Sequence, residues 1–285
     1  MRWLGLFVLS LPLLANPEEL EKNRVILRRA AELLKQDDAN LDKFYFLRRR
    51  ETKELDSDGK VKSRTVVTTR REAYDGLTIT RVVARDDKPL PPDELKRQEE
   101  SIRNNVAEYR RKQAEEKANP KPAPAPKKGD SDADVMIREF PEALDYRLAG
   151  TEMRRGRETL IFDFSPRPGY KPKNFKMKFF EKMKGRIWVD KATNEMVAGD
   201  AEIFETINIG FGVVGTMRKG TRFHMERHEA APGLWVSDSM QVRFAARFML
   251  VKSFFQEMDT RITEFQLRPQ PVAAAANPAA PAGNR

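Results

Sequence analysis

A strict period of two in the C-terminal half constrains the fold more than any other feature of the sequence. Between residues 240 and 250, apolar side chains occupy every second position, and Gln241, Arg243 and Arg247 lie between them. Successive side chains of a β-strand point to opposite faces, so this segment predicts a long strand with one buried face. The apolar positions are Met240, Val242, Phe244, Ala246, Phe248 and Leu250.

Further strands are predicted on both sides of this segment. Residues 42–55, 61–71 and 77–85 are rich in β-branched and aromatic residues, and turn residues separate them at 56–59 and 74–76. This pattern predicts an antiparallel three-stranded meander. The remaining predicted strands are 144–153, 156–164, 185–190, 196–207, 219–229, 234–251 and 254–267.

Two helices are predicted. Residues 16–36 begin with the N-cap residue Asn16 and with Pro17, and their apolar side chains share one face. Residues 93–118 are highly charged with only a thin apolar stripe, so we expect this helix to be largely solvated and to stand off the body. The proline-rich residues 119–133 predict an extended, mobile linker. The alanine- and proline-rich tail, 269–285, is expected to be disordered.

The order of these elements predicts a mainly β protein with helices, of the α+β class. The sheet is expected to be an unclosed antiparallel β-barrel, or strongly curved sheet, with helices covering its concave side. We expect one domain over residues 16–268, in which 93–118 and 119–133 form an insertion.

The first fifteen residues are typical of a secretory signal peptide. Arg2 precedes an apolar run from Trp3 to Leu14, and the small residue Ala15 follows. That run is too short to span a bilayer, so we expect a periplasmic or secreted protein that is soluble after cleavage. The absence of cysteine from the 285 residues excludes disulfides, thiol chemistry and lipidation at an N-terminal cysteine.

Because we expect the protein to be exported, we interpret its net charge of +10 in terms of partners outside the cytoplasm. Anionic lipid head groups or acidic envelope polymers are better matched to that setting than nucleic acid, which we do not expect as a partner. The alternative is that the basic residues only keep the surface soluble.

No motif in the sequence predicts a catalytic or metal site. His224, Glu226 and His228 would share one face of a strand, but residues four apart on a strand are about 13 Å apart and cannot share one ion. No nucleophile elbow, phosphate loop or dinucleotide fingerprint is present. We therefore expect no catalytic residues, no metal and no cofactor, and a protein that is not an enzyme. A hydrolase of envelope material is a further alternative and would need converging acidic residues.

Two segments combine apolar and basic residues and are candidates for contact with lipid. Residues 174–184 would form a short helix with aromatics on one side and lysines around it, a pattern suited to a membrane surface or a lid over lipid. The alternative is a helix that plugs the mouth of the sheet through core contacts. The candidate residues in this segment are Phe175, Phe179, Phe180, Met183, Lys176, Lys178 and Lys182.

The second candidate segment, residues 207–217, carries Phe211 and Val213 on a glycine-rich apolar stretch. Such a loop can insert into lipid or into a groove of a partner. The alternative is a hairpin corner buried against the core.

The order of elements, together with IFDFSPRPGYKP at 161–172 and GRIWVDKATNEM at 185–196, resembles the LolA/LolB-like superfamily of outer membrane lipoprotein-sorting proteins. This resemblance implies an unclosed barrel whose apolar cavity holds acyl chains. It therefore predicts a non-enzymatic periplasmic carrier of lipid or lipoprotein acyl chains, with a membrane surface or an envelope protein as a further partner. The alternative is a cell-envelope interaction or signalling module in which 93–118 is the binding arm.

Overall fold

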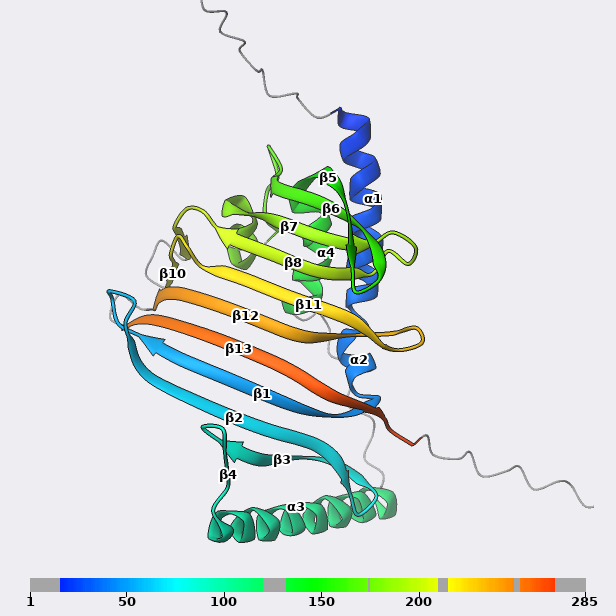
Figure 1. Ribbon diagram of the computed structural model, residues 1–285, viewed down its shortest axis with the longest axis vertical. Coiled ribbons are helices and arrows are strands. Elements are labelled where there is room, and N and C mark those ends of the chain that lie inside the picture. Colours follow the sequence, from blue (N-terminus) through cyan, green and yellow to red (C-terminus); the bar gives the residue numbers. More distant parts are fainter. Residues whose placement is uncertain (1–15, 120–131, 174, 210–214, 249–251, 270–285) are drawn as a thin grey trace, which may run out of the picture.

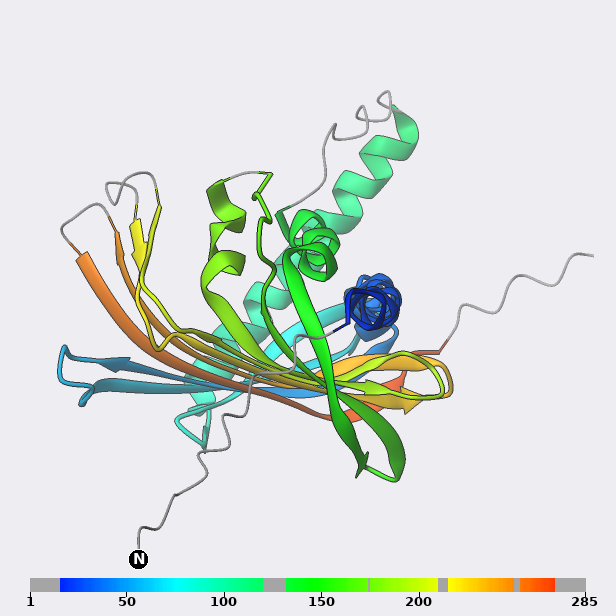
Figure 2. The same cartoon turned by 90° about the horizontal axis from the view of Figure 1, so that it is seen from above.

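The computed structural model describes residues 16–119, 132–173, 175–209, 215–248 and 252–269. Within these residues, thirteen strands form one antiparallel sheet, in the order β4-β3-β2-β1-β13-β12-β11-β8-β7-β6-β5, and β9 and β10 attach beside β12 (Figure 1). The strands at the two ends, β4 and β5, do not pair with each other, so the sheet is not closed, and Figure 2 shows that it is curved. The predicted fold class is therefore confirmed.

The strands agree with the predicted segments to within a few residues. Their bounds are β1 Phe44–Leu55, β2 Val61–Tyr74, β3 Leu77–Arg85, β4 Lys88–Pro89, β5 Leu144–Arg154, β6 Arg157–Pro166, β7 Met183–Asp190, β8 Met196–Ile203, β9 Ile207–Ile209, β10 Gly215–Met217, β11 Arg222–Ala231, β12 Leu234–Phe248 and β13 Lys252–Leu267. The predicted meander is β1–β3. The last strand, β13, pairs with both β1 and β12, and this joins the N-terminal meander to the C-terminal strands in one sheet.

The helices are α1 Pro17–Leu34, α2 Asp37–Leu41, α3 Pro92–Ala118, α4 Asp132–Ala143 and the 3₁₀ helix η1 Phe175–Lys182. Figure 2 shows α1, α4 and η1 on one side of the sheet, which we call the helix-side face, and β12 and β13 bend toward that side. The N-cap prediction is confirmed, because the side chain of Asn16 accepts a hydrogen bond from the Glu18 amide at 3.1 Å.

The main core lies between these helices and β5–β8. Leu27 and Ala30 of α1 are fully buried there against aromatic and aliphatic side chains of the strands. Two polar contacts fix α1 to the edge strand β5: Asn23 donates to the carbonyl of Tyr146 at 2.9 Å, and the buried Arg24 pairs with Asp145 at 2.9 Å. The helix layer therefore covers one end of the sheet, and the central strands extend beyond it.

The charged helix α3 lies along the edge of the sheet at β3, and this differs from the predicted stand-off arm. The side-chain amide of Gln98 donates to the carbonyl of Val82 at 2.9 Å and accepts from its amide at 2.8 Å, as a neighbouring strand would. Arg81 of β3 pairs with Glu99 of α3 at 2.6 Å, and Val106 is buried. An open strand edge invites pairing with other chains, so α3 protects this one. Most of its other side chains are exposed, as predicted.

The structure corrects two predicted boundaries. Helix α4 begins at Asp132, inside the segment predicted to be linker, and no helix was predicted there. The helix predicted over 174–184 is the shorter η1, and Met183 already belongs to strand β7. The predicted signal peptide, most of the predicted linker and nearly all of the C-terminal tail lie outside the described residues. Of the helices that the structure describes, none has the length and apolar character needed to cross a membrane.

Candidate functional site

The central strands β11, β12 and β13 carry a row of apolar side chains on the helix-side face. The pairing register places Phe223, Val242 and Met258 side by side across the three strands, and Met225 beside Met240. Phe223 and Met225 pack against the main core, and this identifies the face. We call the following side chains the apolar stripe: Phe223, Met225, Met240, Val242, Phe244 and Met258.

The apolar stripe is only partly covered. Met240 is 46% exposed, and Val242, Phe244 and Met258 are half-buried. The helices of the main core pack over β5–β8, whereas α2 contacts β12 near Trp235, at the start of that strand. The alternation of 240–246 is thus as predicted, but its apolar face is not fully buried. A partly open apolar surface beside a helix layer is suited to bind an apolar chain.

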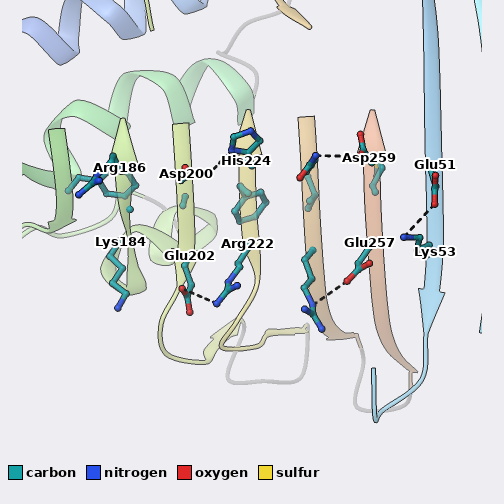
Figure 3. Close-up of a pocket in the computed structure, with 18 of the residues that line it drawn as sticks. Glu51, Lys53, Lys184, Arg186, Asp200, Glu202, Arg222, His224, Glu257 and Asp259 are labelled. Atoms are coloured by element: carbon teal, nitrogen blue, oxygen red, sulfur yellow. Dashed lines mark hydrogen bonds and ion pairs between the residues drawn. The ribbon is translucent and has the colours of Figure 1, made fainter. Parts of the chain in front are cut away.

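The opposite face, which we call the outer face, carries charged residues in a groove of about 890 Å³ (Figure 3). The register aligns them in two rows that cross the sheet from β6 or β7 to β1. One row is Asp163, Arg186, Asp200, His224, Gln241, Asp259 and Glu51, and the other is Lys184, Glu202, Arg222, Arg243, Glu257 and Lys53.

Charges of opposite sign largely compensate one another in this groove. Arg186 pairs with Asp163 at 2.7 Å, and Nδ1 of His224 contacts Asp200 at 2.6 Å. The hydrogen bond from Arg64 lowers the pKa of Glu51 to about 2. Most of the residues that line this groove are charged, so it is not the apolar cavity that the family resemblance implies.

The two histidines contact different carboxylates. His228 lies 3.1 Å from Asp238, whereas His224 contacts Asp200, and both histidines lie on β11 as predicted. Among the residues that the structure describes, no group of three histidine or acidic side chains is arranged to hold a metal ion.

Three of the candidate residues of 174–184 pack between η1 and the sheet: Phe179, Phe180 and Met183. Phe180 and Met183 are buried in the main core, and the ring of Phe179 lies 4.2 Å from that of Phe180. Lys178 is exposed, and Lys182 pairs with Glu205 at 2.6 Å. The side chains of Phe175 and Lys176 lie outside the described part of the structure, as do Phe211 and Val213.

A buried polar cluster, which was not predicted from the sequence, positions α2 over the sheet. Arg227 of β11 is fully buried, and it donates to Asp37 of α2 at 2.8 and 3.0 Å, to Glu195 at 2.9 Å and to the carbonyl of Met196 at 2.8 Å. Asp37 also accepts from the amide of Ser237 at 3.0 Å. The only signal in the sequence is an arginine within a strand, and arginines are common in these strands.

No protein-family model matches this sequence, and a search of curated proteins also gave no match. Among solved structures, the chain is similar to a DUF1329 family protein from Desulfovibrio piger, with 10% identity, a TM-score of 0.33, and coverage of 87% of this chain and 93% of that one.

It is also similar to a LolA superfamily protein from Nitrosomonas europaea, with 9% identity, a TM-score of 0.30, and coverage of 87% of this chain and 94% of that one. An outer membrane lipoprotein-sorting protein domain from Vibrio parahaemolyticus gives 9% identity, a TM-score of 0.32, and coverage of 85% and 93%. One of these structures is thus of the superfamily that the sequence resembles. The site described above rests on this chain's own residues.

Proposed function

We propose that this protein binds the acyl chains of a lipid or lipoprotein on the apolar stripe and acts as a non-enzymatic carrier outside the cytoplasm. The observation that supports the proposal most directly is the partly exposed row of Met240, Val242, Phe244 and Met258 on the helix-side face. The predicted signal peptide supports the location. Such a protein needs a surface for an apolar chain and no reacting group, and the stripe provides that surface.

The dimensions of the stripe suit an extended chain. From Met240 to Ala246 the strand rises about 20 Å, at about 3.4 Å per residue. An acyl chain that lies along this length is stabilised by about 0.8 kcal/mol for each CH₂ group removed from water. Methionine side chains are unbranched and adaptable, so they can fit chains of different lengths.

Displacement of a fluorescent fatty acid tests the proposal. Palmitate is expected to displace the probe from the native protein. The double variant Met240→Gln/Met258→Gln is expected to bind the probe at least about tenfold more weakly, because covering a methionine side chain contributes about 1.5–3 kcal/mol. Both positions are partly exposed, so the fold should tolerate the change.

Met153→Gln provides the matched control. Met153 is 66% exposed at the far end of β5, away from the stripe. This variant is expected to bind the probe as the native protein does. Equal binding by the native protein and the double variant would contradict the proposal, and so would an equal loss in the control.

A further inference from the structure

Three arginines lie together on the helix-side face, next to the apolar stripe. Arg48 and Arg50 are two residues apart on β1 and therefore share a face. The guanidinium groups of Arg48 and of Arg71, on the neighbouring strand β2, lie 5.1 and 5.8 Å from the centre of the same ring, Phe46. We call Arg48, Arg50 and Arg71 the arginine cluster.

The arginine cluster has few acidic partners. In the described part of the chain, no carboxylate lies within ion-pair distance of Arg48 or Arg50, and the buried Nε atoms of Arg48 and Arg71 have no hydrogen-bond partner. Arg71 pairs with the exposed Asp42 at 2.9 Å. Burial and the neighbouring charges of Arg50 and Arg71 lower the pKa of Arg48, and Asp38 offsets this only in part.

In the residues that the structure describes, the arginine between Arg48 and Arg50 has carboxylate partners, in contrast to those two arginines. Arg49 lies between Arg48 and Arg50 but points to the outer face, where it makes two hydrogen bonds of 2.8 Å to Asp87 and another to Glu51. Buried donors that lack partners cost free energy, whereas a bound anion would satisfy them. The arginine cluster therefore has the chemistry of an anion site.

The register places the arginine cluster beside the apolar stripe. Arg50 lies opposite Thr260 of β13, and Thr260 lies opposite Met240 of β12. Neighbouring strands are about 4.8 Å apart, so Arg50 and Met240 are about 10 Å apart across the sheet. Thr52, two residues after Arg50, lies opposite Met258. A single molecule can therefore contact both features.

We propose that the arginine cluster binds the anionic head group of an amphiphile whose acyl chain lies on the apolar stripe. This inference rests on the proposed function and specifies its ligand class. Arginine binds phosphate and carboxylate oxygens with two parallel hydrogen bonds, so either group satisfies the cluster. The polar end of the ligand lies over β1 and β2, and the chain lies over β12 and β13.

Calorimetric titration of the full-length protein with two amphiphiles of equal chain length tests this inference. One is palmitoyl-lysophosphatidylglycerol, which is anionic, and the other is monopalmitoylglycerol, which is uncharged. The native protein is expected to bind the anionic compound at least about tenfold more tightly, a difference of about 1.4 kcal/mol. Arg48→Gln/Arg50→Gln is expected to lose this preference and to bind monopalmitoylglycerol with unchanged affinity.

Arg261→Gln is the matched control. Arg261 lies opposite Arg49 on the outer face and is largely exposed, so this variant is expected to keep the preference. Thermal unfolding of each variant establishes that it is folded. Inorganic phosphate alone is expected to bind at least about a hundredfold more weakly than the anionic amphiphile, because the chain contributes most of the affinity.

The possible results separate this inference from the proposed function. If the native protein binds neither amphiphile, the proposed function fails and the inference fails with it. If it binds both equally, or if the double variant keeps the preference, acyl-chain binding stands and the inference is wrong. Tight binding of inorganic phosphate would also overturn it, since the cluster would then serve a free anion.

Discussion

The buried pair of Arg227 and Asp37 gives the sharpest prediction about stability. Arg227 is fully buried, and Asp37 accepts two of its hydrogen bonds through Oδ1. The other oxygen of Asp37 accepts from the amide of Ser237 at 3.0 Å and from its hydroxyl at 2.5 Å. Among the residues that the structure describes, the substitution Asp37→Ala therefore leaves the buried guanidinium with Glu195 as its one carboxylate partner.

The cost follows from breaking a buried ion pair on one side only. Such a loss typically costs about 3–5 kcal/mol, because the remaining charge stays buried with less compensation than before. For a chain of this size, 1 kcal/mol lowers Tm by about 2–4 °C, so Asp37→Ala is expected to lower Tm by about 6–20 °C. Thermal unfolding followed by circular dichroism measures this shift.

The neighbouring variant Asp38→Ala is the control, because Asp38 is exposed on the same short helix. It is expected to lower Tm by less than about 2 °C, as for an ordinary surface change. A double-mutant cycle that combines Asp37→Ala with Arg227→Met measures the interaction free energy between the two side chains. If Asp37→Ala alone lowers Tm by less than about 2 °C, or if the two substitutions are additive, the cluster does not fix α2 and the reasoning is refuted.

Three further predictions concern the sheet and its edge. Gly185→Ala is expected to destabilise the protein by about 3 kcal/mol or more in urea unfolding, because a Cβ there would lie 1.9 Å from the backbone oxygen of Asp200 and 2.7 Å from the Phe164 ring. An unchanged midpoint would contradict this packing. Gln98→Ala removes both hydrogen bonds to the edge strand β3 and is expected to cost about 1–3 kcal/mol and to increase concentration-dependent association in ultracentrifugation. The pKa of Glu51 is lowered from 4.5 to about 2, chiefly by the hydrogen bond from Arg64, so the ionised carboxylate contributes stability above pH 4.5 that is lost as the pH falls toward 2. Glu51→Gln is therefore expected to flatten the pH dependence of Tm between pH 4.5 and 2. If the curves of Tm against pH for the native protein and the variant run parallel, the ion pair of Glu51 with Arg64 does not contribute to stability.

The strands could be predicted from the sequence because their signals are local. The alternation of residues 240–246 and the turn at Arg155 and Gly156, where both residues have positive φ, depend only on neighbouring side chains. The pairing of β13 with β1 joins residues more than two hundred positions apart, and no local pattern contains it. Likewise, Gln98 forms its strand-like bonds only once α3 lies on β3.

The candidate site could be predicted only in part. The sequence correctly placed Met240, Val242 and Phe244 on one face, but it assigned that face to a buried core. The exposure of these side chains depends on how far the helix layer extends over the sheet. Long-range contacts such as the ion pair of Arg24 with Asp145 fix the position of that layer. The arginine cluster was not predicted either. The alternation of side chains along a strand gives the face of each arginine, but it does not show which arginines form ion pairs with carboxylates.

Mass spectrometry of lipids extracted from the purified protein tests acyl-chain binding most directly. After expression in a bacterial host and purification without detergent, the native protein is expected to carry acyl-chain lipid at close to one molecule per chain, and Met240→Gln/Met258→Gln is expected to carry much less. Native protein without bound lipid, or equal amounts in both proteins, would contradict the assignment of the apolar stripe as the binding surface.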